Sequence, residues 1–432
     1  MPVVFLKAIL GTIFLFIIAS QNYILKQWQP SQEQQLLSEN SHVDRLELKK
    51  VYRLDPDTNN ILYLDMPQHN EQYVMAATNY TVKSVPGITF KPKKINRHAK
   101  LLRLFNEPVD LEPSFYMMPN VKDHNTILTL SMMSFDAYIE VGSNGQWYDL
   151  DSEWGINSTF GWEDKGLRGH VFGNADNSLL IIGFKGTSGS IFNTEPTGEQ
   201  DKFNDNMLFS CCCAKVDRTW KGICECSDKT YSCDSQCLEK KLVSSELYYD
   251  YANVSLDLIL FIPISNLYMQ RIYMSVNDKY PNATIWLTGH SLGGAIASLV
   301  GQTFGVPTVT FESPGDRLAS RRLHMPQPPG ASDLPIWHFG HTADPLFIGV
   351  CTGPMSSCYY AGYAMESRCH AGKVCIWDTV KDHGWRVNLA THRIGDVIEN
   401  IIKKPSEFPL PSCEIQQDCD DCGLWVYNDP RD

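Results

Sequence analysis

Residues 289–293, Gly-His-Ser-Leu-Gly, have the residue types and the spacing for nucleophilic catalysis. The pattern Gly-x-Ser-x-Gly is typical of a nucleophile elbow, a sharp turn that holds the serine in a strained backbone conformation between small residues. A glycine-rich turn at the end of a strand is the alternative. The surroundings favour the elbow, because an apolar segment ends at Thr288 and the small residues in 294–297 suit a helix packed closely on a sheet. Ser291 is therefore the predicted nucleophile.

A serine hydroxyl needs a histidine to accept its proton and a carboxylate to orient that histidine. In α/β hydrolases the acid and then the histidine follow the serine along the chain. Asp344, which follows an apolar segment and precedes a proline, is the predicted acid, and Asp316 is the alternative. An aspartate in this position can also simply cap a turn.

The predicted base is His392, because it lies just before the apolar stretch 397–402, the predicted last helix. His383 is the alternative base, although it could equally be a surface or structural histidine. His290 is a poor candidate, since a side chain next to the nucleophile on such a turn points away from the hydroxyl.

The tetrahedral oxyanion formed in ester cleavage requires preformed hydrogen-bond donors. The backbone N–H of Leu292, directly after the nucleophile, is the first predicted donor. Thr187 is the second, because the segment 184–187, Phe-Lys-Gly-Thr, ends an apolar run with a glycine for a tight turn and a hydroxyl beside its own N–H. An ordinary strand-end turn is the alternative for this segment.

The segments that must position these residues alternate between strand and helix patterns. Continuous apolar runs predict strands buried on both faces, and longer small or apolar stretches predict helices. The predicted strands are 178–184, 284–288, 307–311 and 335–339, and the predicted helices are 239–280 with a break at Pro263, 293–304 and 397–402. This alternation predicts an α/β fold.

The formal net charge of −12, from 37 basic and 49 acidic residues, argues against a nucleic-acid surface and against a polybasic lipid-binding surface. Contact with a membrane would therefore be apolar. No cofactor is expected.

The apolar run 3–19 predicts entry into the secretory pathway, either as an uncleaved anchor or as a cleaved signal peptide. The anchor is favoured, because cleavage after Ala19 or Ser20 would put an isoleucine where a small residue is required. Lys7 can reach the cytosolic interface, which predicts a luminal body.

Fourteen cysteines, half of them in 211–237, predict disulfides in an oxidising compartment. Zinc at Cys419 and Cys422 is the alternative, but no second pair with a matching gap is present, so no metal is expected. Four Asn-x-Ser/Thr triplets predict luminal glycosylation, at Asn79, Asn157, Asn253 and Asn282.

The predicted organisation has four parts. They are a transmembrane signal-anchor (1–25), a polar luminal region that is either a stalk or a small packed domain (26–120), the α/β-hydrolase domain (121–402), and a tail resembling a linker plus a small cystine-closed appendage (403–432). We expect a lid within 188–237, after the oxyanion segment.

Residues 289–294, 184–187 and 341–345 resemble the class 3 (fungal triacylglycerol) lipase family, over roughly residues 120–402. More narrowly, several features resemble the family of fungal vacuolar lipases that break down autophagic bodies: the N-terminal anchor, the Cys-Cys-Cys run, 369–378, 391–394 and the Cys-x-x-Cys-x-x-Trp tail. Lys185 departs from the class 3 pattern, where arginine is usual.

This resemblance implies an α/β-hydrolase fold of the class 3 lipase type with disulfide-rich insertions, and a triad of Ser291, Asp344 and His392. It implies a single-pass type II glycoprotein that travels through the endoplasmic reticulum, Golgi and endosomal (multivesicular body) vesicles to the vacuole. There it would act as a lipase and phospholipase on the phospholipids and neutral lipids of intravacuolar vesicles.

Two other functions remain open at this point. The same elbow serves luminal carboxylesterases that act on non-membrane esters. A membrane-tethered binding protein that kept the hydrolase fold but lost catalysis would also have the anchor and the cystines. An acid and a histidine in the right order weigh against the second.

Overall fold

The computed structural model describes residues 42–55, 60–65, 81–92, 111–139, 168–187, 198–217, 219–227, 229–244, 247, 268–325 and 334–428. Residues Val43–Asp432 form one compact unit. The predicted anchor at 1–25 and the break at Pro263 lie outside the described residues. Among the helices that are described, none has the length and apolarity to cross a membrane.

A central sheet organises the described part of this unit and has nine strands there. In spatial order they are β13 (Cys413–Glu414), β12 (Lys373–Trp377), β11 (Ile336–His341), β10 (Thr308–Phe311), β9 (Thr284–His290), β7 (Leu179–Phe184), β6 (Arg168–Gly173), β2 (Glu47–Asp55) and β3 (Asn60–Asp65). The strands from β12 to β7 are parallel, and the strands outside them are antiparallel. The carboxyl ends of the parallel strands therefore meet along one edge of the sheet.

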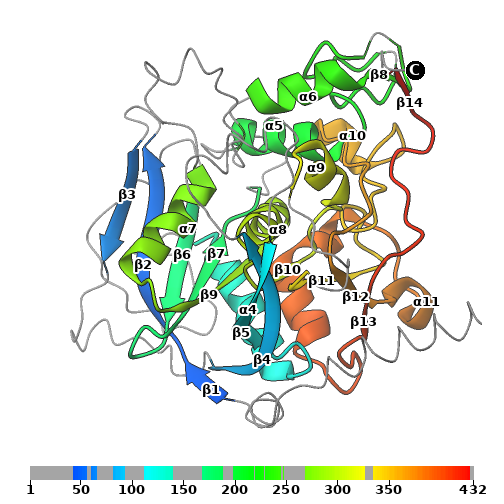
Figure 1. Ribbon diagram of the computed structural model, residues 1–432. Coiled ribbons are helices and arrows are strands. Elements are labelled where there is room, and N and C mark those ends of the chain that lie inside the picture. The colour runs from blue at the N-terminus through cyan, green and yellow to red at the C-terminus, as the bar shows by residue number, and fades with distance from the viewer. Residues whose placement is uncertain are drawn as a thin grey trace, which may run out of the picture. The chain divides into compact units, whose positions relative to one another are not determined.

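Apolar cores lie on both faces of this sheet. Alternate residues of β7 point to opposite faces, so Leu180 and Ile182 join one core while Leu179 and Ile181 join the other. The first core includes α8 (Leu292–Phe304) and α7 (Tyr268–Lys279), and the second includes α4 (His124–Asp136). Figure 1 shows these helices around the sheet. A sheet covered on both faces explains the continuous apolar runs of its strands.

Smaller elements complete the fold. The strands β1 (His42–Arg45), β4 (Thr81–Pro92) and β5 (Leu111–Pro119) form a second sheet, and β14 (Val426–Asn428) pairs with β8 (Ser232–Asp234). The remaining helices are α5 (Gly198–Phe209), α6 (Ser235–Ser244), α9 (Arg317–Arg322), α10 (Ser357–Ala361), α11 (Thr379–His383), η3 (Leu389–His392), α12 (Ile394–Val397) and η4 (Ile398–Ile402).

The predicted strands and the helix at 293–304 are confirmed within a few residues, as β7, β9, β10, β11 and α8. Of the predicted helix 239–280, the structure describes one end as α6 and the other as α7, and most of the segment between them lies outside the described residues. The predicted last helix begins earlier, at Ile394, and continues as the π-helix η4.

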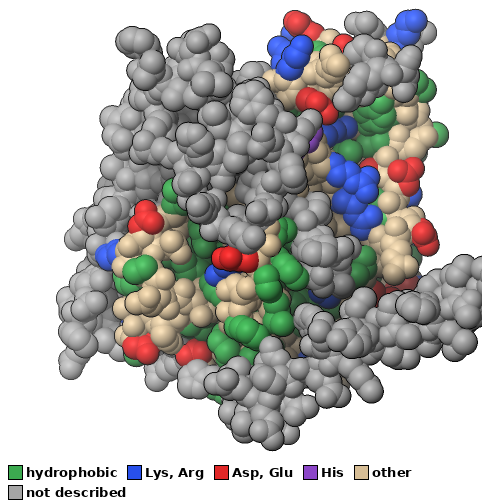
Figure 2. Space-filling model, viewed as in Figure 1, with side chains coloured by type: hydrophobic (Ala, Val, Ile, Leu, Met, Phe, Trp, Pro, Cys, Tyr) green, Lys and Arg blue, Asp and Glu red, His purple; other side chains and the backbone are tan. Residues whose placement is uncertain are grey.

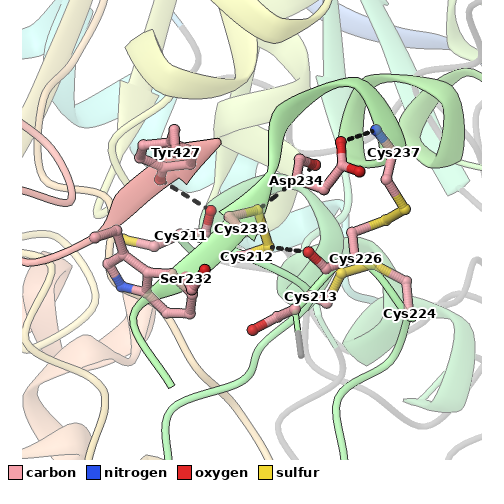
Figure 3. Close-up of a disulfide and its surroundings, with 12 residues drawn as sticks. Cys211, Cys212, Cys213, Cys224, Cys226, Ser232, Cys233, Asp234, Cys237 and Tyr427 are labelled. Atoms are coloured by element: carbon pink, nitrogen blue, oxygen red, sulfur yellow. Dashed lines mark hydrogen bonds between the residues drawn. A yellow bond between two sulfur atoms is a disulfide. The ribbon is translucent and has the colours of Figure 1, made fainter. Parts of the chain in front are cut away.

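All fourteen cysteines form disulfides, which confirms the predicted cystine framework. The pairs are Cys211–Cys422, Cys212–Cys233, Cys213–Cys224, Cys226–Cys237, Cys351–Cys358, Cys369–Cys419 and Cys375–Cys413. Figure 3 shows how closely the cystines of the 211–237 segment cluster. Cys419 and Cys422, the residues of the zinc alternative, are thus held in disulfides.

The tail and the N-terminal region differ from the predicted organisation. The tail cysteines bond to cysteines of the hydrolase domain rather than to one another, and β13 pairs with β12, so the tail is not a separate appendage. In the N-terminal region, β2 pairs with β6 and extends the central sheet. The exposed edges of an α/β sheet are available for hydrogen bonding, so segments remote in sequence can complete it.

Candidate active site

Ser291 lies between β9 and α8 in a backbone conformation of φ 56° and ψ −132°. Residues other than glycine rarely adopt these backbone angles, so the turn is strained, as is typical of a nucleophile elbow. A Cβ on Gly289 would lie 2.6 Å from the Gly293 carbonyl, and a Cβ on Gly293 would lie 2.4 Å from the Phe184 carbonyl oxygen. The two glycines are therefore required by close backbone contacts. The Ser291 N–H donates to the Phe311 carbonyl at 3.1 Å, which ties the turn to β10.

The structure brings Ser291, His392 and Asp344 together. His392 Nε2 lies 2.9 Å from Ser291 Oγ, and its Nδ1 lies 2.7 Å from Asp344 Oδ2. Asp344 Oδ1 also accepts from the Leu346 N–H at 2.9 Å. An Nδ1–H that donates to Asp344 leaves Nε2 as the acceptor for the serine proton, which is the tautomer needed for a general base.

The electrostatics of the acid agree with that arrangement. Asp344 is fully buried, and the His392 side chain is 13% exposed. Burial raises the pKa of Asp344, but the charge and hydrogen bond of His392 outweigh burial and hold that pKa below its usual range. Asp344 is therefore ionised and able to orient the imidazole.

The alternative acid and base lie elsewhere. Asp316 is buried at the start of α9, where Ser298 Oγ donates to it and the Ala371 N–H donates at 2.8 Å. His383 packs on Phe408 with ring centroids 4.1 Å apart. Both have structural contacts of their own.

His290 contacts the base rather than the serine hydroxyl, and its ring centroid lies 4.6 Å from that of His392. Its Nε2 is 2.8 Å from the His392 carbonyl and its Nδ1 is 2.8 Å from Tyr138 Oη. Burial, followed by the charge of His392, lowers the pKa of His290 to about 3. A neutral His290 therefore donates from Nε2 to the His392 carbonyl and helps to hold the backbone of the base.

On the oxyanion side, Gly186 lies against the nucleophile, since a Cβ built there would be 3.1 Å from Ser291 Cβ. Thr187 follows it, and its hydroxyl donates to Asp205 Oδ2 at 2.6 Å. Leu292 is the first residue of α8, where backbone N–H groups are free of helical partners. The segment 184–187 and Leu292 thus approach the serine from two sides.

Sequence reasoning missed two buried carboxyl groups, Asp205 and Glu312. Asp205 is in α5, within the segment expected to hold the lid, and burial raises its pKa to about 8. Lys185, the departure from the class 3 pattern, is buried beside it with Nζ 3.4 Å from Asp201 Oδ2. No local motif marks either acid, although charged residues inside an otherwise apolar neighbourhood are a signal once the fold is known.

Three of the four predicted glycosylation sites, and the start of the segment expected to hold the lid, lie outside the described part of the chain. Asn79, Asn157, Asn253 and residues 188–197 are not among the described residues. Asn282 is exposed in the turn before β9. Glycosylation stays a prediction.

A family model described as Lipase (class 3) matches residues 226–306, which include the elbow. Together with the parallel sheet and the Ser–His–Asp contact, the comparisons show that the chain belongs to the class 3 lipase family, with an α/β-hydrolase fold. Within it, the chain is similar to yeast proteins that bear the name "Putative lipase ATG15".

The protein of that name in Kluyveromyces lactis is 45% identical over 327 residues, which cover 73% of this chain and 58% of the relative. The one in Meyerozyma guilliermondii is 41% identical over 386 residues, covering 84% and 62%. This chain therefore spans less than two thirds of the length of these relatives. The solved Lip2 lipase from Yarrowia lipolytica is 16% identical with a TM-score of 0.29, covering 59% of this chain and 78% of Lip2.

Proposed function

We propose that this chain is a serine lipase and phospholipase that hydrolyses acyl esters of membrane lipids. The observation that carries the proposal is the continuous contact from Asp344 through His392 to Ser291 on a strained elbow. A fold kept only for binding would have no need of a strained backbone that directs a serine hydroxyl at an imidazole nitrogen.

Each residue has a definite role in the proposed reaction. His392 Nε2 accepts the proton of Ser291 as Oγ attacks the acyl carbonyl, and Asp344 stabilises the resulting imidazolium. The oxyanion accepts hydrogen bonds from the N–H groups of Leu292 and Thr187. His392 then protonates the departing alcohol. Water, deprotonated by His392, hydrolyses the acyl-enzyme and restores the serine.

The hydroxyl of Thr187 already donates a hydrogen bond to Asp205. The proposed donor of Thr187 to the oxyanion is therefore its backbone N–H. A short hydrogen bond between a threonine and a buried acid fixes the loop in place before the substrate arrives. Preformed donors of this kind are the usual source of the largest rate contribution in acyl transfer.

The proposed substrates are the phospholipids and neutral lipids of intravacuolar vesicles, including autophagic and multivesicular-body vesicles. The family membership, the names of the yeast relatives and the cystine framework support a luminal lipase. The proposed setting is a type II glycoprotein anchored by residues 1–25. In the view of Figure 2, the described Lys and Arg side chains lie at several separate places among acidic, hydrophobic and other residues and form no single broad basic surface. This distribution gives no support to polybasic contact with lipid, so the proposed contact is apolar.

Labelling by a fluorophosphonate probe tests the nucleophile. The wild type should be labelled, Ser291→Ala should not, and Ser412→Ala, which alters an exposed serine, should be labelled like the wild type. Equal labelling of wild type and Ser291→Ala would refute the assignment.

Substrate class needs a second measurement. Release of fatty acid from phosphatidylcholine vesicles should exceed turnover of short soluble esters, and the assay should be run at acid and neutral pH. Activity on soluble esters alone would favour the luminal carboxylesterase, and no activity on either would favour the binding protein.

A further inference from the structure

Tyr138 is a residue that the proposed reaction does not use, although its hydroxyl contacts the elbow. It follows α4 directly, and its N–H donates to the Phe135 carbonyl at 3.0 Å, which continues the end of the helix as a turn. The helix is joined to β9 by Ser134, whose Oγ lies 2.9 Å from Thr288 Oγ1. The end of α4 and the end of β9 are therefore held together, and the Tyr138 hydroxyl meets the residue before the nucleophile.

The direction of each hydrogen bond in this contact is fixed by the groups at its ends. The His392 carbonyl can only accept, so His290 Nε2, at 2.8 Å, carries a proton. Burial lowers the pKa of His290 to about 3, so the ring has only this one proton and Nδ1 is an acceptor. Burial also raises the pKa of Tyr138 well above its usual range, so the hydroxyl keeps its proton and donates it to Nδ1 at 2.8 Å. Two hydrogen bonds thus run in sequence from Tyr138 through His290 to the backbone of the base.

The hydroxyl favours one of the two neutral forms of His290. In a neutral imidazole the partner of one nitrogen decides which nitrogen carries the proton. Without the hydroxyl, Nδ1 loses the donor that it has in the structure, and the form with the proton on Nδ1 becomes available. In that form Nε2 would turn a lone pair toward the His392 carbonyl oxygen, and two acceptors 2.8 Å apart repel each other.

The backbone of His392 matters because its ring must meet two partners at once. His392 is the last residue of the short helix η3, and its side chain contacts Asp344 at 2.7 Å and Ser291 at 2.9 Å. The preceding carbonyl, that of Thr391, lies 3.1 Å from His341 Nε2. Two consecutive carbonyl groups at the base are therefore held by histidine side chains, and Tyr138 acts on one of these histidines.

The same hydroxyl also packs against the oxyanion side of the site. A Cβ built on Gly186 would collide with Tyr138 Oη and with the carbonyl oxygen of His290. Glycine is therefore required at position 186 by the hydroxyl and the elbow together. The Tyr138 side chain lies between the segment 184–187 and the residue that holds the base.

We propose that Tyr138 is a positioning residue that acts through His290: its hydroxyl holds His290 in the form that donates to the His392 carbonyl, and so keeps the base in line with Ser291. The proposal rests on the proposed function, since it concerns the general base of that reaction. The effect is on the orientation of His392 and not on substrate binding, so kcat should respond to the loss of the hydroxyl and KM should not.

The test is a double-mutant cycle between Tyr138 and His290, read as kcat and KM on a soluble ester. Tyr138→Phe removes only the hydroxyl and should lower kcat about 10-fold with KM unchanged, because a displaced base is poorly placed for proton transfer. In His290→Gln the side-chain amide can donate to the His392 carbonyl without help from Tyr138. Adding Tyr138→Phe to that variant should therefore change kcat by less than about 2-fold.

Tyr116→Phe is the matched control. It also removes a buried tyrosine hydroxyl, one that accepts from the Ile285 N–H at 2.7 Å near the start of β9, at the opposite end of that strand from Ser291. This variant should lose stability in denaturant titrations and keep the kcat of the wild type.

Equal losses of kcat from Tyr138→Phe in the wild-type and His290→Gln backgrounds overturn the proposal, because a merely structural role of the hydroxyl would not depend on His290. A Tyr138→Phe enzyme with the kcat of the wild type overturns it as well. If Tyr138→Phe does not fold, His290→Asn replaces it: the shorter amide does not reach the His392 carbonyl, so kcat should be about 10-fold below that of His290→Gln. Equal kcat values for these two variants would overturn the proposal.

Fluorophosphonate labelling of the same samples separates the two hypotheses. A wild type that is not labelled refutes the proposed function. A labelled wild type, together with a loss from Tyr138→Phe that does not depend on His290, refutes only the role of Tyr138.

Discussion

Replacing Gly293 by alanine should force apart the end of β7 and the start of α8, which flank the proposed oxyanion site. The added Cβ would lie 2.4 Å from the Phe184 carbonyl oxygen and 2.6 Å from the Lys185 carbonyl carbon, against an ordinary contact of at least 3.4 Å. These atoms are backbone at the end of β7, so no side chain can turn aside. The start of α8 and the end of β7 must therefore move apart by about 1 Å, and a misplacement of that size can cost about 100-fold in rate.

The loss should appear in both activity and stability. We expect kcat/KM on a soluble ester to fall about 100-fold, and the free energy of unfolding in denaturant to fall by about 1–3 kcal/mol, as is usual for overpacking. Gly423→Ala is the matched control, because its Cβ would meet only the end of the Asp420 side chain at 3.3 Å. A Gly293→Ala enzyme with the kinetics and stability of the control would refute the close approach of β7 and α8.

Two further predictions concern stability. Replacing both cysteines of Cys211–Cys422 by serine should lower the free energy of unfolding by about 2–5 kcal/mol. The loss should exceed that for Cys351–Cys358, because the cysteines of the first bond are 211 residues apart in sequence and those of the second are 7 apart. Equal losses in denaturant titrations would contradict the chain-entropy explanation. Burial lowers the pKa of His370 to about 4, so the unfolded chain binds a proton that the native state does not, and His370 should cost stability as pH falls from about 6.5 to about 4. Asp316, whose pKa burial raises, acts in the opposite sense, so the comparison of wild type with His370→Gln across pH isolates the histidine; identical pH dependence of unfolding would count against its buried, neutral state.

The sequence by itself predicted the parts of this protein that depend on local chemistry. The elbow is local, because Gly289 and Gly293 are needed by the turn that contains Ser291. The continuous apolar run at 178–184 predicted a strand buried on both faces, and β7 is one. The order serine, acid, histidine along the chain predicted Asp344 and His392. These two residues are 48 positions apart in the sequence, and the structure brings them into contact beside the serine.

Only the tertiary structure decided the features that depend on neighbours in space. An even number of cysteines permitted complete pairing, but many pairings satisfy that count, and the tail cysteines bond to the hydrolase domain instead of to one another. The strands β2 and β13 complete the sheet from regions that their sequence presented as separate. Glu312 and Asp205 resemble any other acid in the sequence. The contacts of Glu312 with His341 and of Asp205 with Thr187, and the burial that raises the pKa of both acids, arise only when strands and helices distant along the chain pack together.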